Sequence, residues 1–267
     1  MKDAIADSTR TAGNRHTVHP ARRHPWRWLA LGCGLALTGG GAVQADAFDS
    51  LGDLDQSSFL DLSEHLAAAT HYKGVTPAEP LGVLGFDVGV GLSSTPIDET
   101  LFDAASSGDF GAPSLLLPRV SAHKGLPFGI DIGAFVGIVP KSDLRMLGAE
   151  LRYAILEGGV ATPALAVRAS YSKGVGLDAL DIDNAGLELT VSKGFVMFTP
   201  YAGAGIVKSN VTPADSGADA TTLSKESFQQ EKLFVGVNVN LVGLNLTAEA
   251  DRTGDHTSYS GKIGIRF

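Results

Sequence analysis

The chain has 267 residues, with 21 Lys and Arg against 29 Asp and Glu and a formal net charge of −8. Removing residues 1–45, which we interpret as a secretory signal, leaves 222 residues with 15 basic and 27 acidic side chains. This acidic balance argues against nucleic acid as a partner, since phosphate binding needs a basic face. The length is enough for one domain of substantial size.

The first 45 residues predict an export signal. Arg22, Arg23 and Arg27 form its positive region, Trp28–Leu37 form its apolar core, and cleavage is expected after Ala45. The apolar core is too short and too rich in glycine to span a bilayer as a helix. The arginine pair lacks the rest of a twin-arginine pattern, so we expect Sec-type export.

Cys33, the only cysteine, lies inside this signal. The mature chain therefore has neither disulfides nor thiolate zinc sites, and we expect no metal and no cofactor, since the sequence carries no phosphate loop, dinucleotide fingerprint or HExxH pattern. After the signal, no apolar run approaches the length of a membrane-spanning helix. If the protein lies in a membrane it must do so as a closed barrel, because backbone groups that face lipid have to be paired.

Residues 46–79 predict one amphipathic helix and a linker. Between Asp49 and His71 apolar residues recur near helical spacing, and Ser58 and Asp61 suggest a cap. Thr76–Pro80 ends the element. The helix could lie at the membrane surface, pack beneath the barrel or block its mouth. Its acidic polar face disfavours contact with anionic lipid, so we favour a periplasmic lid or partial plug.

From Leu81 onward the apolar period becomes two, which indicates strands. Pro118 predicts a bulge or kink in the second strand. About ten strands are expected in a domain over residues 80–267, at 84–92, 114–123, 128–138, 145–155, 163–171, 182–192, 199–209, 232–241, 244–250 and 256–267.

The connections between these strands alternate in length. Short ones lie at 124–127, 157–159, 193–197 and 242–243, and longer ones at 93–113, 174–181 and 208–227. Short turns at one end and long loops at the other are typical of a barrel in the outer membrane, with the long loops outside the cell. An even strand count then returns Phe267 to the periplasmic rim.

The last strand places Tyr259, Gly261, Ile263, Ile265 and Phe267 on one face. This pattern and the terminal Phe resemble the closing strand of bacterial outer-membrane β-barrels. The resemblance implies an all-β, antiparallel up-and-down transmembrane barrel in a Gram-negative outer membrane, in contact with lipid. It also implies an assembly signal, read by the barrel-assembly machinery. The residues expected to form that signal are Tyr259, Ile263, Ile265 and Phe267.

The opposite strand faces carry charges of both signs. In a barrel of about ten strands the lumen is narrow, so we expect these charges to pair across it and favour a salt-bridged interior over a selectivity filter. The expected lumen-lining residues are Asp87, Asp131, Glu150, Arg152, Arg168, Glu188, Lys232, Glu249, Asp251, Lys262 and Arg266.

Asp255, His256 and Ser258 are weak catalytic candidates. A His near a Ser can activate it if an acid orients the imidazole, and His-x-Ser on a barrel strand resembles outer-membrane lipid A deacylases. The acid expected in the same strand is missing, so a solvated loop histidine is the favoured interpretation. Three aspartates of another loop suggest a loose calcium or omptin-type site that no motif supports: Asp178, Asp181 and Asp183.

The sequence therefore favours a non-enzymatic, porin-like outer-membrane protein, either structural in the envelope or passing a small or amphipathic solute. One alternative is a lipid-modifying hydrolase that uses His256 and Ser258. Another is a soluble periplasmic β-sandwich binding protein. The oligomeric state is left open.

Overall fold

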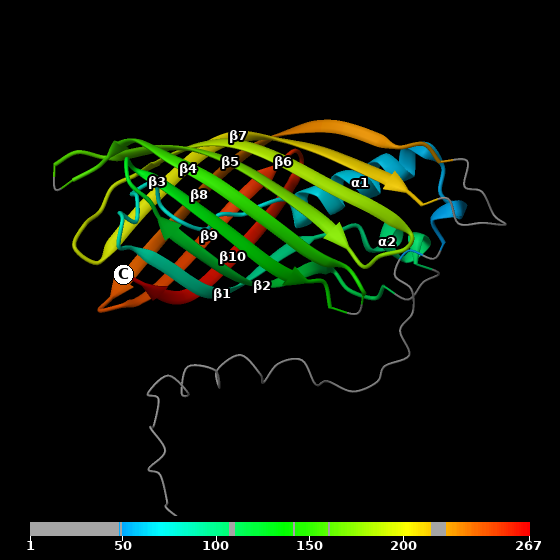
Figure 1. Cartoon of the computed structure of the whole chain (residues 1–267). Coiled ribbons are helices and arrows are strands. Elements are labelled where there is room, and N and C mark those ends of the chain that lie inside the picture. Colours follow the sequence, from blue (N-terminus) through cyan, green and yellow to red (C-terminus); the bar gives the residue numbers. More distant parts are fainter. Residues whose placement is uncertain (1–47, 49, 107–109, 141, 160, 215–222) are drawn as a thin grey trace, which may run out of the picture. The chain divides into compact units, whose positions relative to one another are not determined.

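The computed structural model describes residues 48, 50–106, 110–140, 142–159, 161–214 and 223–267. All of them belong to one compact unit, Val43–Phe267. The predicted signal and Cys33 lie outside the described residues. Within the described part of the chain, ten antiparallel strands form one closed barrel (Figure 1). This confirms the predicted all-β, up-and-down barrel, and the β-sandwich alternative is wrong because a single sheet closes on itself.

Each strand pairs with its neighbours in the chain, and the first pairs with the last. Phe86 and Phe267 meet at this seam, where each backbone N–H donates to the other residue's carbonyl. The strands are β1 (Phe86–Pro96), β2 (Ser114–Gly125), β3 (Ile130–Ile138), β4 (Arg145–Glu157), β5 (Ala164–Val175), β6 (Leu180–Ser192), β7 (Phe198–Pro213), β8 (Glu226–Leu241), β9 (Leu244–Thr253) and β10 (His256–Arg266).

Two strand predictions need correction. β7 continues to Pro213 and β8 already begins at Glu226, so both ends of the long loop predicted at 208–227 are strand. The apolar face stops before the strands do, which hid their ends. β2 runs straight through Pro118 without a bulge, because its pairing with β3 begins only at Arg119 and the missing N–H of proline is not needed there.

The N-terminal region is two elements rather than one helix. A short 3₁₀ turn, η1 (Leu51–Asp53), precedes α1 (Gln56–Thr70). The N-cap is Asp55 and not Ser58, since the Asp55 side chain accepts the Ser58 backbone N–H at 2.8 Å. Hydrogen bonds from Ser58 and from the Ser57 hydroxyl lower the pKa of Asp55 below its usual value. No described helix is long and apolar enough to cross a membrane.

Helix α1 lies inside the barrel. It contacts β1, β2, β6 and β10, which stand on different sides of the wall, and the residues from Leu66 to Thr70 are all buried (Figure 1). A helix enclosed by protein on every side has no need of a fully polar face. This explains the run Ala67-Ala68-Ala69, which a surface helix does not require.

The chain threads the lumen from one end to the other. We call the end that holds Phe267 and the start of β1 the C-terminal end, and the opposite one the loop end. At the loop end Phe48 packs on Phe102 of α2 (Glu99–Ala105), and the Ser50 N–H donates to Ala105 O at 3.0 Å. Residues 71–85 then pass to the C-terminal end. The segment 50–81, which we call the plug, therefore begins at the mouth of the loop end and continues inside the barrel, with its helix toward the loop end rather than as a lid at the C-terminal end.

Candidate functional site: the plugged lumen

The lumen is polar and closely filled. Of the eleven side chains expected to line it, ten are buried and Arg266 is half-buried. They come from β1, β3, β4, β5, β6, β8, β9 and β10, so the alternation in sequence brings them to one interior. A buried charge is costly unless it is paired and hydrogen-bonded. The arrangement of partners therefore decides what this interior does.

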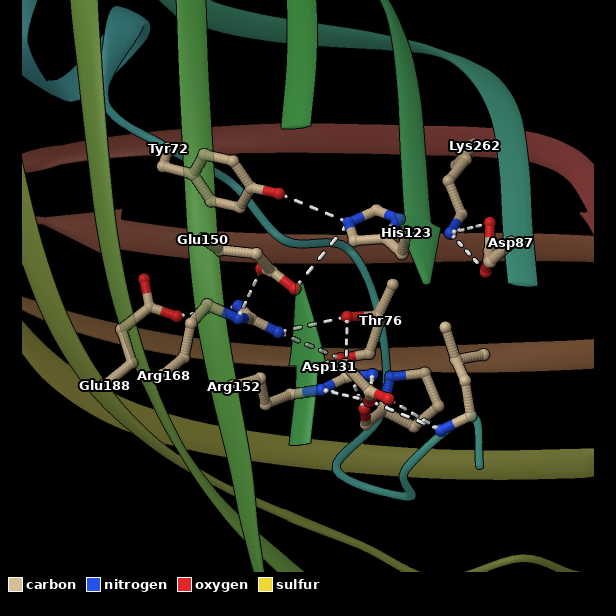
Figure 2. Close-up of polar contacts among 12 residues, drawn as sticks. Tyr72, Thr76, Asp87, His123, Asp131, Glu150, Arg152, Arg168, Glu188 and Lys262 are labelled. Carbon is tan, nitrogen blue, oxygen red and sulfur yellow. Dashed lines mark hydrogen bonds and ion pairs between the residues drawn. The ribbon is translucent and has the colours of Figure 1, made fainter. Parts of the chain in front are cut away.

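Ion pairs line the inner face of the wall from β3 to β6 (Figure 2), and one more reaches β8. Arg152 Nη2 lies 2.6 Å from Asp131 Oδ2. Arg168 lies between two carboxylates, with Nε 2.9 Å from Glu150 Oε2 and Nη1 2.8 Å from Glu188 Oε2. Lys232 Nζ continues the series, 2.7 Å from Glu188 Oε1. Farther round the wall Lys262 on β10 pairs with Asp87 on β1 at 2.9 Å.

Glycines let charges two strands apart meet. Gly205 on β7 stands in register between Glu188 on β6 and Lys232 on β8. A Cβ at Gly205 would lie 2.9 Å from Glu188 Cγ. Gly133 has the same place between His123 and Glu150, where a Cβ would lie 2.9 Å from Glu150 Cγ. The alternation of glycine in the sequence therefore serves contact between side chains across a strand.

The wall also satisfies the backbone of the plug (Figure 2). Arg152 Nη1 donates to Pro77 O at 2.8 Å and to Thr76 Oγ1 at 2.8 Å, and Arg168 Nη2 donates to Thr76 Oγ1 at 3.0 Å. In turn the Leu81 N–H donates to Asp131 at 3.1 Å. An irregular segment can be buried only if its backbone groups find such partners. The residues that pair the wall thus also hold the plug.

Lys73 is the second attachment of the plug. Its Nζ lies 3.0 Å from both carboxylate oxygens of Asp251 on β9 and donates to Ser258 Oγ at 3.1 Å and to Ala68 O at 2.9 Å. Lys73 and Asp251 are both buried. No sequence periodicity marks Lys73, so it escaped prediction. A lone Lys in a linker gives no signal of burial.

Arg119 on β2 differs from the other lumen cations. It is buried, but Nη1 and Nη2 have no hydrogen-bond partner among the described residues, and its guanidinium lies 6.0 Å from the centre of the Phe135 ring. Arg119 and His123 were also missed as lumen residues. The signal was present, since both share the odd-numbered face of β2 with the buried Leu117.

The three catalytic candidates each contact other residues and do not form a triad. The His256 ring packs on His65 of α1, with 4.0 Å between centroids, while Ser258 is buried and bonds Lys73 and Thr95. Asp255 is exposed and pairs with Arg252 at 2.8 Å. Within the described part of the chain no hydrogen bond joins His256 to Ser258. Burial lowers the pKa of Lys73 to about 8, whereas the Asp251 carboxylate favours its charged form. The Ser258 hydroxyl beside it is buried.

The aspartates of the β5–β6 region are not gathered into a site. Asp178 and Asp181 are exposed, and Asp183 lies 3.7 Å from Lys173. Among the residues that the structure describes, no group of three or more His, Cys, Asp and Glu is arranged to hold a metal ion.

No family model matches the chain, and no curated protein matches it. Solved structures with a similar fold include the N-terminal β-barrel domain of OprF from Pseudomonas aeruginosa (TM-score 0.35, 11% identity, covering 70% of this chain and 99% of that one). The KdgM porin (0.36, 9%, 68% and 99%) and OprG from Pseudomonas aeruginosa (0.33, 11%, 71% and 99%) are others. These neighbours are outer-membrane β-barrel proteins. At such scores the similarity is one of general architecture and says nothing about the role of this chain.

Proposed function

We propose that this chain is a Gram-negative outer-membrane β-barrel protein with a structural role in the envelope, whose lumen is closed by its own N-terminal segment. The observation that carries the proposal is the inverted distribution of side chains. Charged groups are buried inside, and large apolar groups are exposed outside. This is the arrangement that lipid around the wall and a narrow polar lumen require.

The outer wall is apolar on every side. Each strand exposes at least one large apolar residue, for example Val90, Val136, Leu151, Leu189 and Val235. The largest apolar patch on a soluble monomer is typically about 300–600 Å². An apolar band that runs right round a barrel is not a feature of a protein in water, and it favours lipid as the surrounding medium.

The filled lumen favours a structural role over passage of a solute. The C-terminal half of the plug helix, the segment 71–78 and the ion pairs of the wall occupy the interior together, and their side chains are buried. A solute path would need the plug to leave and Lys73, Thr76 and Leu81 to give up their wall partners. The lipid hydrolase alternative has no supporting geometry, since Ser258 is enclosed by Lys73 and Thr95.

Export through Sec and recognition of the last strand by the assembly machinery remain parts of the proposal. Tyr259, Ile263, Ile265 and Phe267 are exposed on the outer face of β10 and its end. They are therefore accessible to a partner during insertion and to lipid afterwards.

Membrane fractionation with gel mobility before and after boiling, followed by conductance in planar bilayers, tests the proposal. We expect the protein in the outer membrane, a mobility shift on boiling and no stable conductance steps. A soluble protein without a shift would remove the membrane barrel. A shifted outer-membrane protein with large, steady conductance steps would retain the barrel and contradict the closed lumen.

A further inference from the structure

The turns at the C-terminal end of the barrel have apolar tips. Val196 in the β6–β7 turn and Val242 in the β8–β9 turn are fully exposed. Phe128 in the β2–β3 turn is 87% exposed, and Leu84 just before β1 is 91% exposed. These residues lie beyond the strands, at the end where Figure 1 marks the C-terminus.

Three of these tips also have an unfavourable backbone, since Phe128 has a φ of 66°. Val196 and Val242 have φ of 52° and 43°. The left-handed region is a genuine outlier for a β-branched residue, and Asn, Asp or Gly is the usual choice for a tight hairpin turn. A valine that is both strained and fully exposed is not favoured by water, whereas an apolar medium favours it over Asn, Asp or Gly.

The apolar band on the outer wall is displaced toward the same end. On β8 the outward residues from Leu233 to Leu241 are apolar as far as the turn, whereas Gln229 and Glu231 near the loop end are polar. Other strands repeat this arrangement. Their exposed polar residues near the loop end are Arg145, Lys173, Asp181, Lys208 and Arg252.

Aromatic side chains mark the borders of this band. Exposed rings gather at the C-terminal end, where Phe86 and Phe267 are 5.0 Å apart between centroids. The other exposed rings there are Phe128, Tyr153, Phe195 and Phe198. Tyr171 and Tyr259 are exposed on the wall toward the loop end. From Tyr259 to Phe267 a tilted strand rises roughly 20 Å, close to the height of a barrel's apolar band.

The exposed rings at the C-terminal end lie at the level of the turns. Because such rings mark the border of the membrane, that border lies at the level of the turns as well. We propose that the turns at the C-terminal end are immersed in the lipid of the adjoining leaflet, so that the barrel sits low in the membrane and its strands project from the other side. The occupant of this apolar rim is lipid, since Val196, Val242 and Phe128 continue the lipid-facing wall. The lysines at this end, Lys124 and Lys193, donate to backbone carbonyls of the turns, and Glu157 is exposed at the end of β4. The proposal rests on the membrane barrel proposed above.

Tryptophan fluorescence in vesicles with brominated acyl chains tests this depth. The chain's only tryptophans, Trp26 and Trp28, precede the predicted cleavage point, so each variant is read as its difference from wild type. The test variants are Val196→Trp and Leu84→Trp, the second at a position without positive φ. Val235→Trp on the wall is the lipid control. Asp255→Trp in the β9–β10 turn at the loop end is the water control.

We expect bromine to quench the tryptophan at 196 and at 84 as it does at 235, and to leave 255 unquenched. Quenching at 235 alone would overturn the inference, because the turns would then lie in water or against a protein partner. An absence of quenching at 235 as well would instead remove the membrane barrel itself. The mobility shift on boiling shows for each variant that the barrel is folded.

Discussion

Two stretches of the lumen wall bury arginine in opposite ways. On β4 and β5, Arg152 and Arg168 contact Asp131, Glu150 and Glu188, and both also hold Thr76 of the plug. On β2, Arg119 is just as buried but has no partner for Nη1 or Nη2 among the described residues. Burial alone therefore does not make a lumen charge stabilising. A buried lumen charge is stabilised by its ion-pair and hydrogen-bond partners, and those of Arg152 and Arg168 belong to both the wall and the plug.

Arg168→Met should have the largest effect. The change breaks the ion pairs with Glu150 and Glu188, although Glu188 keeps Lys232 and Thr76 keeps Arg152, and breaking a buried pair costs about 3–5 kcal/mol. We expect a loss of unfolding free energy near the upper end of that range, measured by urea unfolding in lipid vesicles. A loss below about 1 kcal/mol would mean that water reaches Glu150 and Glu188 freely.

Lys73→Met should come next, because it breaks one buried ion pair, that with Asp251, rather than two. We expect a loss of about 3 kcal/mol. The plug should also loosen, so that protease added to folded protein cleaves near residues 71–81 faster than in wild type. An unchanged cleavage rate together with unchanged stability would show that the Asp251 contact does not hold the plug.

Gly205→Ala should have an intermediate effect that comes from packing alone. The new Cβ would overlap the Leu187 carbonyl and lie 2.9 Å from Glu188 Cγ, and overpacking of this kind costs about 1–3 kcal/mol. Gly261→Ala is the matched control, since a Cβ at Gly261 has its nearest neighbour at 4.0 Å. Equal stability of the two variants in urea would contradict the role given to Gly205.

Arg119→Met should have the smallest effect on the free energy of unfolding, and its direction should be toward greater stability rather than a loss. Removing an unpaired buried charge in favour of an apolar chain of similar length is neutral or stabilising, by about 1 kcal/mol. The side chain would keep its contact with Phe135. A loss as large as that of Arg168→Met would erase the contrast between the two stretches of wall.

The strands of the barrel wall could be predicted from the sequence because their inner face is polar and their outer face is apolar. Alternation placed Glu188 and Lys232 on the interior face, and Gly205 between them gave room for their pairing. Strand ends were less readable. On β7 and β8 the apolar face ends while the pairing continues, so Asn210 and Glu226 were assigned to a loop.

The plug was not readable for a different reason. Residues 71–81 have no period, and their position is set by contacts with side chains far along the chain, such as Lys73 with Asp251. Even the helix was predicted only in outline, because the choice of Asp55 over Ser58 as its cap depends on the extended backbone that precedes it. Local patterns fix local structure, whereas a threaded segment is fixed by the walls around it.

Hydrogen–deuterium exchange on the folded protein in lipid tests the central claim most directly, that the N-terminal segment fills the lumen. The Ala78 and Leu81 amides donate to Ser192 and Asp131 of the wall. We therefore predict that peptides over residues 66–81 exchange as slowly as those of the neighbouring strands. Exchange as fast as at the exposed Gly254–Asp255 turn would place this segment outside the barrel and contradict the closed lumen.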